Sequence, residues 1–173
     1  MADLAIILHN IRSTYNVGAI LRTAEGLGVK TVVFSGYTPF PAVKNDPRLP
    51  HLKAKIDKQI NKVALGAEKM LDSVLVADFL AWARQNHYQL VALEQAPNSI
   101  KLPDLTASDL PPKIALLLGE ETHGISPKIL EQCAKIIEIP MCGQKESFNV
   151  SVAAGIALYQ LTLLPHNPCQ KSA

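Results

Sequence analysis

The sequence contains, at residues 114–124, the stretch Ile114-Ala-Leu-Leu-Leu-Gly-Glu-Glu-Thr-His-Gly124. Five apolar residues in a row predict a strand that is buried on both faces, as in a parallel sheet. The glycine and the two glutamates that follow mark the end of this strand and the start of a polar loop. Because ligands of parallel α/β sheets bind beyond the carboxyl ends of the strands, this stretch predicts both the fold class and the edge that carries the site.

Further apolar runs alternate with segments of helical spacing along the chain. This alternation predicts an α/β fold, with a parallel sheet that has helices on both faces. We expect helices over residues 17–27 and 149–163, the first with Asn16 as its N-cap and Gly28 at its end. The other expected elements are strands at 4–8, 31–34, 72–77, 89–93 and 136–139, helices from Asp78 to about Gln85 and from Ser126-Pro127, a helical turn at 64–70, and proline-rich connections within 36–61 and 95–113.

The composition is that of a globular protein of 173 residues, with 48% hydrophobic and 18% charged residues. It excludes a disordered chain, which is poor in apolar residues. Three cysteines without a Cys-x-x-Cys pair exclude a disulfide scaffold and a zinc knuckle, so we expect no metal. No signal-peptide pattern is present, and the longest apolar stretch, residues 150–164, is too short and interrupted for a membrane helix. We therefore expect one cytoplasmic domain over residues 1–173, with a core over 1–163 and a tail over 164–173.

Positive charge is concentrated in residues 44–69, although the whole chain carries only +2. Seven basic residues stand against three acidic ones there, so the segment carries +4 and the rest of the chain −2. Such a segment suits a phosphate-bearing partner such as RNA. The alternative is an ordinary solvated loop and helix face. The residues that we expect to contact RNA are Arg12, Lys44, Arg48, Lys53 and Lys55.

The loop after the first expected strand concentrates amides and cationic side chains, and Arg22 lies on the helix that follows. Asn16 and Arg22 are nearly two turns apart, so Arg22 reaches the loop only by running toward the helix N-terminus, the direction that helical side chains favour. A guanidinium and amides at a helix N-terminus suit a phosphate or a ribose. The alternative is a set of helix caps and one surface arginine.

Two more loops follow expected strands. The loop 119–124 matches neither a phosphate-binding P-loop nor Gly-x-Gly-x-x-Gly, and its acidity permits a cationic or hydroxyl-rich ligand. Its glycines allow close approach of a ligand, or they simply shape a turn. The loop 140–149 places Ser147 and Asn149 before the last helix. That helix is apolar on nearly every side, so we expect the domain or a partner subunit to bury it all round.

In this order the three loops resemble the motifs of the SpoU/TrmH branch of the SPOUT superfamily, which are RNA 2′-O-ribose methyltransferases that use S-adenosylmethionine. The matching stretches are Asn10-x-Arg-Ser-x-x-Asn16-x-Gly-x-x-x-Arg22-x-Ala, Leu118-Gly-Glu-Glu-x-x-Gly124-Ile-Ser and Ile139-Pro-Met-x-Gly-x-x-x-Ser147-x-Asn149-Val-Ser-Val-Ala153. Together with Ala64-Leu-Gly-Ala-Glu68 they extend over residues 4–163.

The resemblance implies a C-terminal deep trefoil knot and a homodimer formed through the last helix. It also implies a pocket for S-adenosylmethionine between the second and third loops and the end of strand 89–93. The residues that it places against this cofactor are Leu93, Gly119, Gly124, Ile139, Met141 and Phe148, the last where the family usually has leucine.

The resemblance also assigns catalytic residues by position. Arg22 matches the catalytic arginine, Asn16 the asparagine that supports it, and Glu121 the acidic residue of the second motif. Ser147 and Asn149 match the residues that organise the active site. Arg22 is either the base that takes the 2′-hydroxyl proton or a charged clamp on a neighbouring phosphate.

Three other functions stay open from the sequence: methylation of a base nitrogen, RNA binding by an inactive homodimer of the same fold, and an unrelated nucleotide-binding α/β enzyme. The Asn16–Arg22 pair argues against the first, the intact motif residues against the second, and the missing phosphate loop against the third. The family often carries an extra N-terminal RNA-binding domain. Because our first strand is expected at residue 4, we expect the domain itself to select its RNA, and the choice between tRNA and rRNA stays open.

Overall fold

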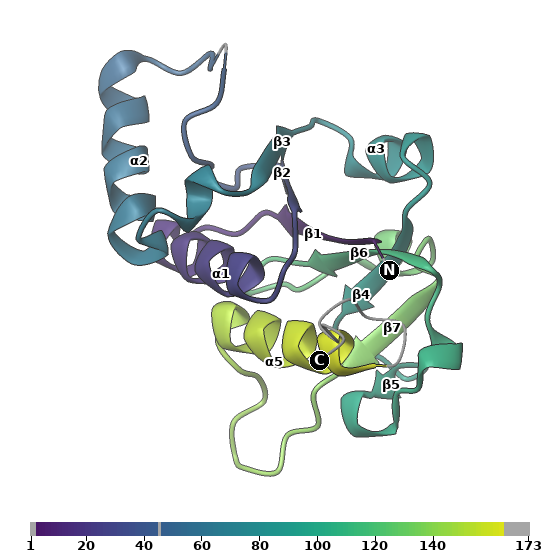
Figure 1. Cartoon of the computed structure of the whole chain (residues 1–173). Helices are drawn as coiled ribbons and strands as arrows, with labels where there is room; N and C mark the ends of the chain where they lie inside the picture. Colours follow the sequence, from purple (N-terminus) through teal and green to yellow (C-terminus); the bar gives the residue numbers. More distant parts are fainter. Residues whose placement is uncertain (1–2, 45, 165–173) are drawn as a thin grey trace, which may run out of the picture.

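The computed structural model describes residues 3–44 and 46–164 (Figure 1). Within them, a seven-stranded sheet has all its strands parallel, in the order β3-β2-β1-β6-β4-β7-β5. The predicted parallel α/β sheet is therefore confirmed. The strands are β1 (Asp3–His9), β2 (Thr31–Ser35), β3 (Asp72–Leu75), β4 (Gln89–Leu93), β5 (Ile100–Lys101), β6 (Lys113–Leu118) and β7 (Lys135–Glu138).

Both faces of the sheet are covered, as the apolar strands predicted. Successive residues of β1 point to opposite faces, so Ile6 and Leu8 join one core cluster while Ala5 and Ile7 join the other. The first cluster lies under α1 (Thr14–Gly26), α2 (Pro50–Ala64) and α5 (Val150–Leu163). The second lies under α3 (Phe79–Gln85) and the single turn α4 (Pro127–Leu130), on the other side (Figure 1).

Several boundaries differ from the sequence predictions. The N-cap of α1 is Ser13, whose hydroxyl accepts from the Asn16 backbone N–H, so the predicted cap Asn16 lies in the first turn with its side chain free for other contacts. Gly28 follows α1 with a φ of +79°, as expected for a helix end. The connection 95–113 contains β5, which was not predicted because two residues are too few for a pattern. The helical turn at 64–70 is divided between the end of α2 and a 3₁₀ turn, Ala67–Lys69.

α1 and α2 cross at very short range, and Gly18 makes this possible. A Cβ at Gly18 would lie 2.7 Å from the Ile60 carbonyl oxygen and 2.9 Å from the Val63 Cβ. The C-terminal half of α2 therefore packs directly on α1 at Gly18, a residue within the first motif.

One side of α5 is open. Ala154, Ala157, Leu158 and Leu161 are buried against the sheet and α1, but a second row of residues is 39–59% exposed. Of the two expected coverings, the described part of this chain supplies one only for a single side of the helix, and burial of the other side by a partner subunit stays a prediction. None of the helices in the described part of the chain is both long and apolar enough to cross a membrane. The expected tail lies outside the described residues from position 165 onward. The exposed row consists of Val152, Ile156, Tyr159 and Leu163.

Candidate functional site

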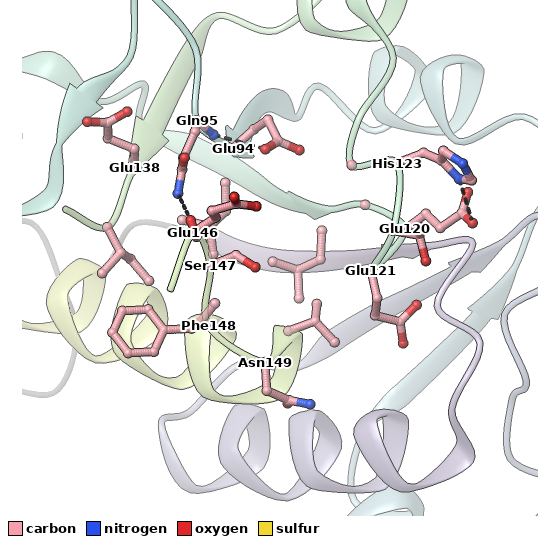
Figure 2. A pocket seen from close by; sticks show the side chains of 18 of the residues that line it. Glu94, Gln95, Glu120, Glu121, His123, Glu138, Glu146, Ser147, Phe148 and Asn149 are labelled. Carbon is pink, nitrogen blue, oxygen red and sulfur yellow. Dashed lines mark hydrogen bonds and ion pairs between the residues drawn. The ribbon is translucent and has the colours of Figure 1, made fainter. Parts of the chain in front are cut away.

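A cavity of about 600 Å³ opens where β6, β4 and β7 end (Figure 2). These three strands are neighbours and run parallel, so the loops that follow them meet at one edge of the sheet. The walls come from residues 119–124, 94–95 and 139–149. All six residues that were predicted to hold a cofactor line this cavity: Leu93, Gly119, Gly124, Ile139, Met141 and Phe148.

Asn16 joins the three motif loops through its amide. Its Nδ2 donates to Glu121 Oε1 at 3.1 Å, and its Oδ1 accepts from Asn149 Nδ2 at 3.3 Å. Asn149 is also the N-cap of α5, because its Oδ1 accepts from the backbone N–H and the hydroxyl of Ser151 at 2.9 and 2.7 Å. The N-termini of α1 and α5 therefore meet beside Glu121 at the cavity wall.

Glu120 gathers cationic and aromatic side chains at the rim of the cavity. His123 Nδ1 lies 3.1 Å and Arg12 Nη2 3.4 Å from its Oε1. The hydrogen bond with His123 lowers the pKa of Glu120, and a hydrogen bond with Tyr37 adds to this effect. The backbone N–H of Arg12 donates to Glu121 Oε2 at 3.2 Å, while its side chain is 73% exposed. Arg12 thus stands at the entrance, where a ligand can reach its guanidinium.

Glu94 fixes the loop 119–124 from the end of β4. Its two carboxylate oxygens accept from the backbone N–H groups of Ile125, at 2.9 Å, and Gln95, at 3.0 Å. Gly124 has a φ of +65°, and a Cβ there would collide with this carboxylate. A Cβ at Gly119 would lie 2.5 Å from Ile125 Cγ1. Both glycines are needed to close their own loop, which confirms the reading that they shape a turn. Their predicted contact with a cofactor stays a prediction.

Among the described residues, the charged side chains that line the cavity are almost all acidic. They include five glutamates and one histidine, and neither lysine nor arginine is among them. Such a wall favours a ligand with positive charge and disfavours phosphate groups. The glutamates are Glu94, Glu120, Glu121, Glu138 and Glu146.

The third loop has few contacts. Residues 142–149 are exposed, and Gln95 Nε2 ties the loop to β4 by donating to the Glu146 carbonyl oxygen at 2.7 Å. The hydroxyl of Ser147 points into the cavity (Figure 2) and makes no hydrogen bond within the described residues. It is therefore available to a ligand.

Arg22 does not line the cavity. It lies exposed on α1 and makes no hydrogen bond or ion pair with the described residues. The next residue, Thr23, borders α5, because a Cβ at Gly155 would be 3.6 Å from Thr23 Cγ2. The structure brings the other four predicted catalytic residues together and places Arg22 on the surface beside α5.

Arg48 was predicted to contact RNA, but its guanidinium makes hydrogen bonds within the protein. Its Nε and Nη2 donate to both carboxylate oxygens of Asp46 at 2.9 and 2.6 Å, and its Nη1 donates to the Phe40 carbonyl oxygen. The guanidinium lies 3.7 Å from the Phe40 ring centroid, and its side chain is only 15% exposed. These contacts with Arg48 hold the pKa of Asp46 well below its usual range. These contacts disfavour the predicted role of Arg48 in RNA binding, whereas Lys44 and Lys55 are exposed and Lys53 is half-buried.

Sequence reasoning missed four glutamate and glutamine side chains of the site. Glu94 and Gln95 directly follow β4, so the rule that singled out polar loops after strands would have found them. Glu138 is the last residue of β7, and the apolar residues beside it made this stretch look like an ordinary buried strand. Its Oε2 accepts a hydrogen bond from Ser99 Oγ at 2.6 Å. Glu146 lies inside the third motif at a position that the motif leaves free.

Comparison with known proteins gives a consistent picture. The model of the SpoU rRNA Methylase family matches residues 3–159. The 23S rRNA (guanosine-2′-O-)-methyltransferase RlmB of Haemophilus ducreyi is 31% identical over 160 residues, which cover 91% of this chain and 58% of that protein. The chain thus spans little more than half the length of this relative.

Two solved structures show the same fold. The TrmH/SpoU tRNA modifying enzyme of A. aeolicus matches with a TM-score of 0.71 and 28% identity, over 92% of this chain and 74% of that one. The AdoMet-bound rRNA methyltransferase of Sinorhizobium meliloti matches with a TM-score of 0.77 and 23% identity, over 93% and 56%. The family resemblance of the three loops is confirmed.

Proposed function

The chain belongs to the SpoU rRNA Methylase family, and from this premise we propose that it transfers a methyl group from S-adenosylmethionine to a ribose 2′-hydroxyl of tRNA or rRNA. The observation that carries the proposal is the acidic cavity beside the Asn16–Glu121–Asn149 network, where the three motif loops meet. The family match includes all three loops.

The cavity suits S-adenosylmethionine in charge and in size. This cofactor carries a sulfonium and an ammonium group and no phosphate, so the glutamates of the wall favour it. A volume of about 600 Å³ lies in the range of small-molecule sites. Leu93, Ile139, Met141 and Phe148 would hold its apolar parts. When bound, the cofactor supplies an electrophilic methyl group.

The residues around the cavity prepare the ribose hydroxyl. Negative charge develops on the attacking oxygen, and the meeting N-termini of α1 and α5 carry partial positive charge that stabilises it. Asn16 and Glu121 keep the two helices in this position. The free hydroxyl of Ser147 would hydrogen-bond the ribose, and as the ribose oxygen takes the methyl group, its proton would pass to a phosphate of the RNA or to water.

The exposed face of α2 provides a path for the RNA backbone. Its basic residues recur at helical spacing on the side opposite Ile60 and Ala64, which are buried against α1. At 1.5 Å per residue, Lys55 to Lys62 spans roughly 10 Å, enough to follow successive phosphates. The residues of this stripe are His51, Lys55, Lys58 and Lys62. Lys44, which precedes α2, and the half-buried Lys53 are proposed as further contacts with phosphate.

A homodimer formed through the open side of α5 would explain two observations: the exposed apolar row on α5 and the position of Arg22 outside the cavity. The exposed row on α5 is apolar, and contact with a second copy would remove it from water. Arg22 is exposed on α1, next in sequence to Thr23, which borders α5, and it does not line the cavity of its own chain. We assign it to RNA that is bound in the cavity of the partner subunit, as a charged clamp on phosphate, the role that suits an exposed guanidinium.

Strand order supports the knotted C-terminus that the sequence motifs imply. β7 is paired on both sides with strands that precede it in the chain, β4 and β5. The knot itself, the single domain over residues 1–173 and the cytoplasmic location stay predictions.

The experiment uses tRNA and rRNA from a strain that lacks the gene, with labelled S-adenosylmethionine. We expect transfer of label, and digestion to nucleosides should place it on the ribose. Glu121→Gln should reduce the transfer by at least about 10-fold, because it loses a charge-assisted contact. Glu131→Gln, an exposed carboxylate outside the cavity, is the matched control and should remain active. Label on a base would instead identify a base methyltransferase, and the lack of any transfer would support the inactive RNA-binding alternative.

A further inference from the structure

An exposed tyrosine stands at the rim of the cavity and has no role in the site described above. Tyr37, in the loop after β2, is 49% exposed. Its hydroxyl lies close enough to the carboxylate of Glu120, which lines the cavity, to help lower the pKa of that group. The guanidinium of Arg12 lies over its ring, 5.9 Å from the ring centroid. An aromatic ring and an exposed cation therefore flank the entrance together.

The backbone that carries Tyr37 is firmly held. Its N–H donates to Asn10 Oδ1 at 3.3 Å, and Gly36 makes the turn before it with a φ of +64°. On its other side, the buried Thr38 hydroxyl donates to the Leu8 carbonyl oxygen and accepts from the Ile11 N–H, both at 3.0 Å. The loop after β2 is thus bonded to the loop after β1, so the exposure of Tyr37 does not come from a loose segment.

We infer that Tyr37 is a stacking platform for an unpaired base of the RNA substrate, with Arg12 as the ligand of an adjacent phosphate. The inference rests on the proposed function, because RNA must lie at this entrance for the ring to be used. The acidic wall repels phosphates, so the rim has to hold the nucleotide by other means. Stacking on an aromatic ring does so for any base, and a neighbouring arginine adds to it. The hydrogen bond from its backbone N–H to Asn10 Oδ1 holds the residue that carries the ring in place.

The test compares two 12-nucleotide RNAs of equal charge, oligouridine and an abasic ribose-phosphate chain of the same length. The wild-type protein should bind oligouridine more tightly by roughly 5- to 100-fold, the range for stacking of one base. Tyr37→Leu should lose this preference, whereas Tyr37→Phe should keep most of it. Arg12→Gln should flatten the salt dependence of binding by about 0.7 units of slope, and Tyr37→Leu should not. Met70→Ala, which removes an exposed side chain before β3 at the opposite edge of the sheet, is the control.

Calorimetry with S-adenosylhomocysteine distinguishes a failure of the Tyr37 stacking platform from a failure of the methyltransferase assignment. Tyr37→Leu should bind it like the wild type, because Tyr37 does not line the cavity. If Tyr37→Leu retains the preference for oligouridine, the platform is refuted while the methyltransferase assignment stands. If the wild type shows the preference but transfers no methyl group to any RNA, the assignment fails and the platform stands. A wild-type protein that binds both RNAs equally would also overturn the platform.

Discussion

The amide of Asn16 donates to a carboxylate on one side and accepts from another amide on the other. Only a side chain with both functions can make these two contacts, and they connect residues that lie more than a hundred positions apart in the chain. The network depends on this one group because Asn149 uses its own oxygen to cap α5. Removing the donor of Asn16 therefore affects the positions of two helices.

Asn16→Asp tests this role through pH. The new carboxylate would face Glu121 at about 3 Å, in place of the hydrogen bond of 3.1 Å, and the repulsion raises the pKa of the pair. We expect methyl transfer at pH 8 to fall by at least about 10-fold. As the pH falls toward 5, protonation restores a donor, so the deficit relative to the wild type should shrink. Single-turnover rates across pH measure this, with the exposed Asn86→Asp as a control. A deficit of equal size at every pH would contradict the role of Asn16 as a donor.

Arg48 and Lys55 belong to the same basic segment but should behave in opposite ways. Lys55→Gln should leave the free energy of unfolding unchanged and lower the salt slope of RNA binding by about 0.7. Arg48→Gln should lower the free energy of unfolding by about 2 kcal/mol, because it breaks charged hydrogen bonds in a half-buried site, and leave the salt slope unchanged.

The effect of Arg48→Gln should also depend on pH. The pKa of Asp46 is lowered in the folded protein, so its ionised form stabilises the fold above the unfolded pKa of about 4, and this contribution is lost as the pH falls further. The stability difference between the wild type and Arg48→Gln should therefore narrow below pH 4. Urea unfolding at several pH values checks it. An unchanged difference down to pH 2 would show that Asp46 is not the partner that matters.

Residue types and spacing could predict that Glu121, Ser147 and Asn149 lie in loops at the end of a strand or the start of a helix, and the family resemblance gave them their expected roles. They could not predict that Arg48 is engaged, since the contact with Phe40 depends on the path of a loop. Nor could they show that Arg22 lies apart from the cavity, because helical spacing gives a direction along α1 but not the neighbour that it meets.

Among the elements, α1 and α2 pack in close contact, and the absence of a side chain at Gly18 allows it. The apolar patterns predicted α1 from its periodicity, but they could not predict how closely α2 approaches it. Proline residues in 36–61 concealed where α2 begins, and the helix starts with one of them, Pro50. Proline is well suited to that first position because it has no N–H to leave unpaired.

Gly18→Val should separate the two helices. The added carbons would meet the Ile60 carbonyl oxygen and the Val63 side chain, so we expect the free energy of unfolding to fall by about 1–3 kcal/mol. Gly26→Ala is the matched control, because a Cβ there meets nothing within 4 Å, and it should stabilise α1 slightly. Urea unfolding monitored by circular dichroism compares them. Equal stability of Gly18→Val and the wild type would show that the crossing can relax.

For the whole molecule, the open side of α5 is the largest departure from a self-contained fold. Nearly every residue of this helix is apolar, yet only one side is buried in the described chain. The sequence could predict that something covers the helix, but not the order of the strands beneath it. Alternating and continuous patterns of apolar residues indicate which face of the sheet a residue occupies. They do not indicate which strands are neighbours in the sheet.

Ile156→Glu should convert a dimer into a monomer. Ile156 lies in the exposed row of α5, so the substitution would place an unpaired charge in the proposed interface without disturbing the core of one chain. Sedimentation at micromolar concentration should show a dimer for the wild type and for the control Met70→Glu, which changes an exposed residue elsewhere. A wild-type protein that sediments as a monomer would refute the dimer.

Mixing two inactive variants tests whether Arg22 serves the partner subunit. Arg22→Ala lacks the clamp and Glu121→Gln lacks the intact cavity wall, and each should be nearly inactive alone. In a mixed dimer, one cavity would have both an intact wall and an arginine from the other chain, so activity should return on mixing after subunit exchange. No recovery, with exchange confirmed by labelled subunits, would place Arg22 in its own active site.

The long separation in sequence between β1 and its partner β6 has a consequence for the way the fold forms during translation. β1 leaves the ribosome more than a hundred residues before β6, its partner from Asp3 and Lys113 onward, so one edge of β1 stays unpaired while most of the chain is made. Pairings of such separation are slow to form. The cavity needs residues 139–149 and forms only after this loop has left the ribosome. A polypeptide that stops before this loop lacks part of the cavity wall, so we expect the proposed binding of a methyl donor to begin in one late step of folding.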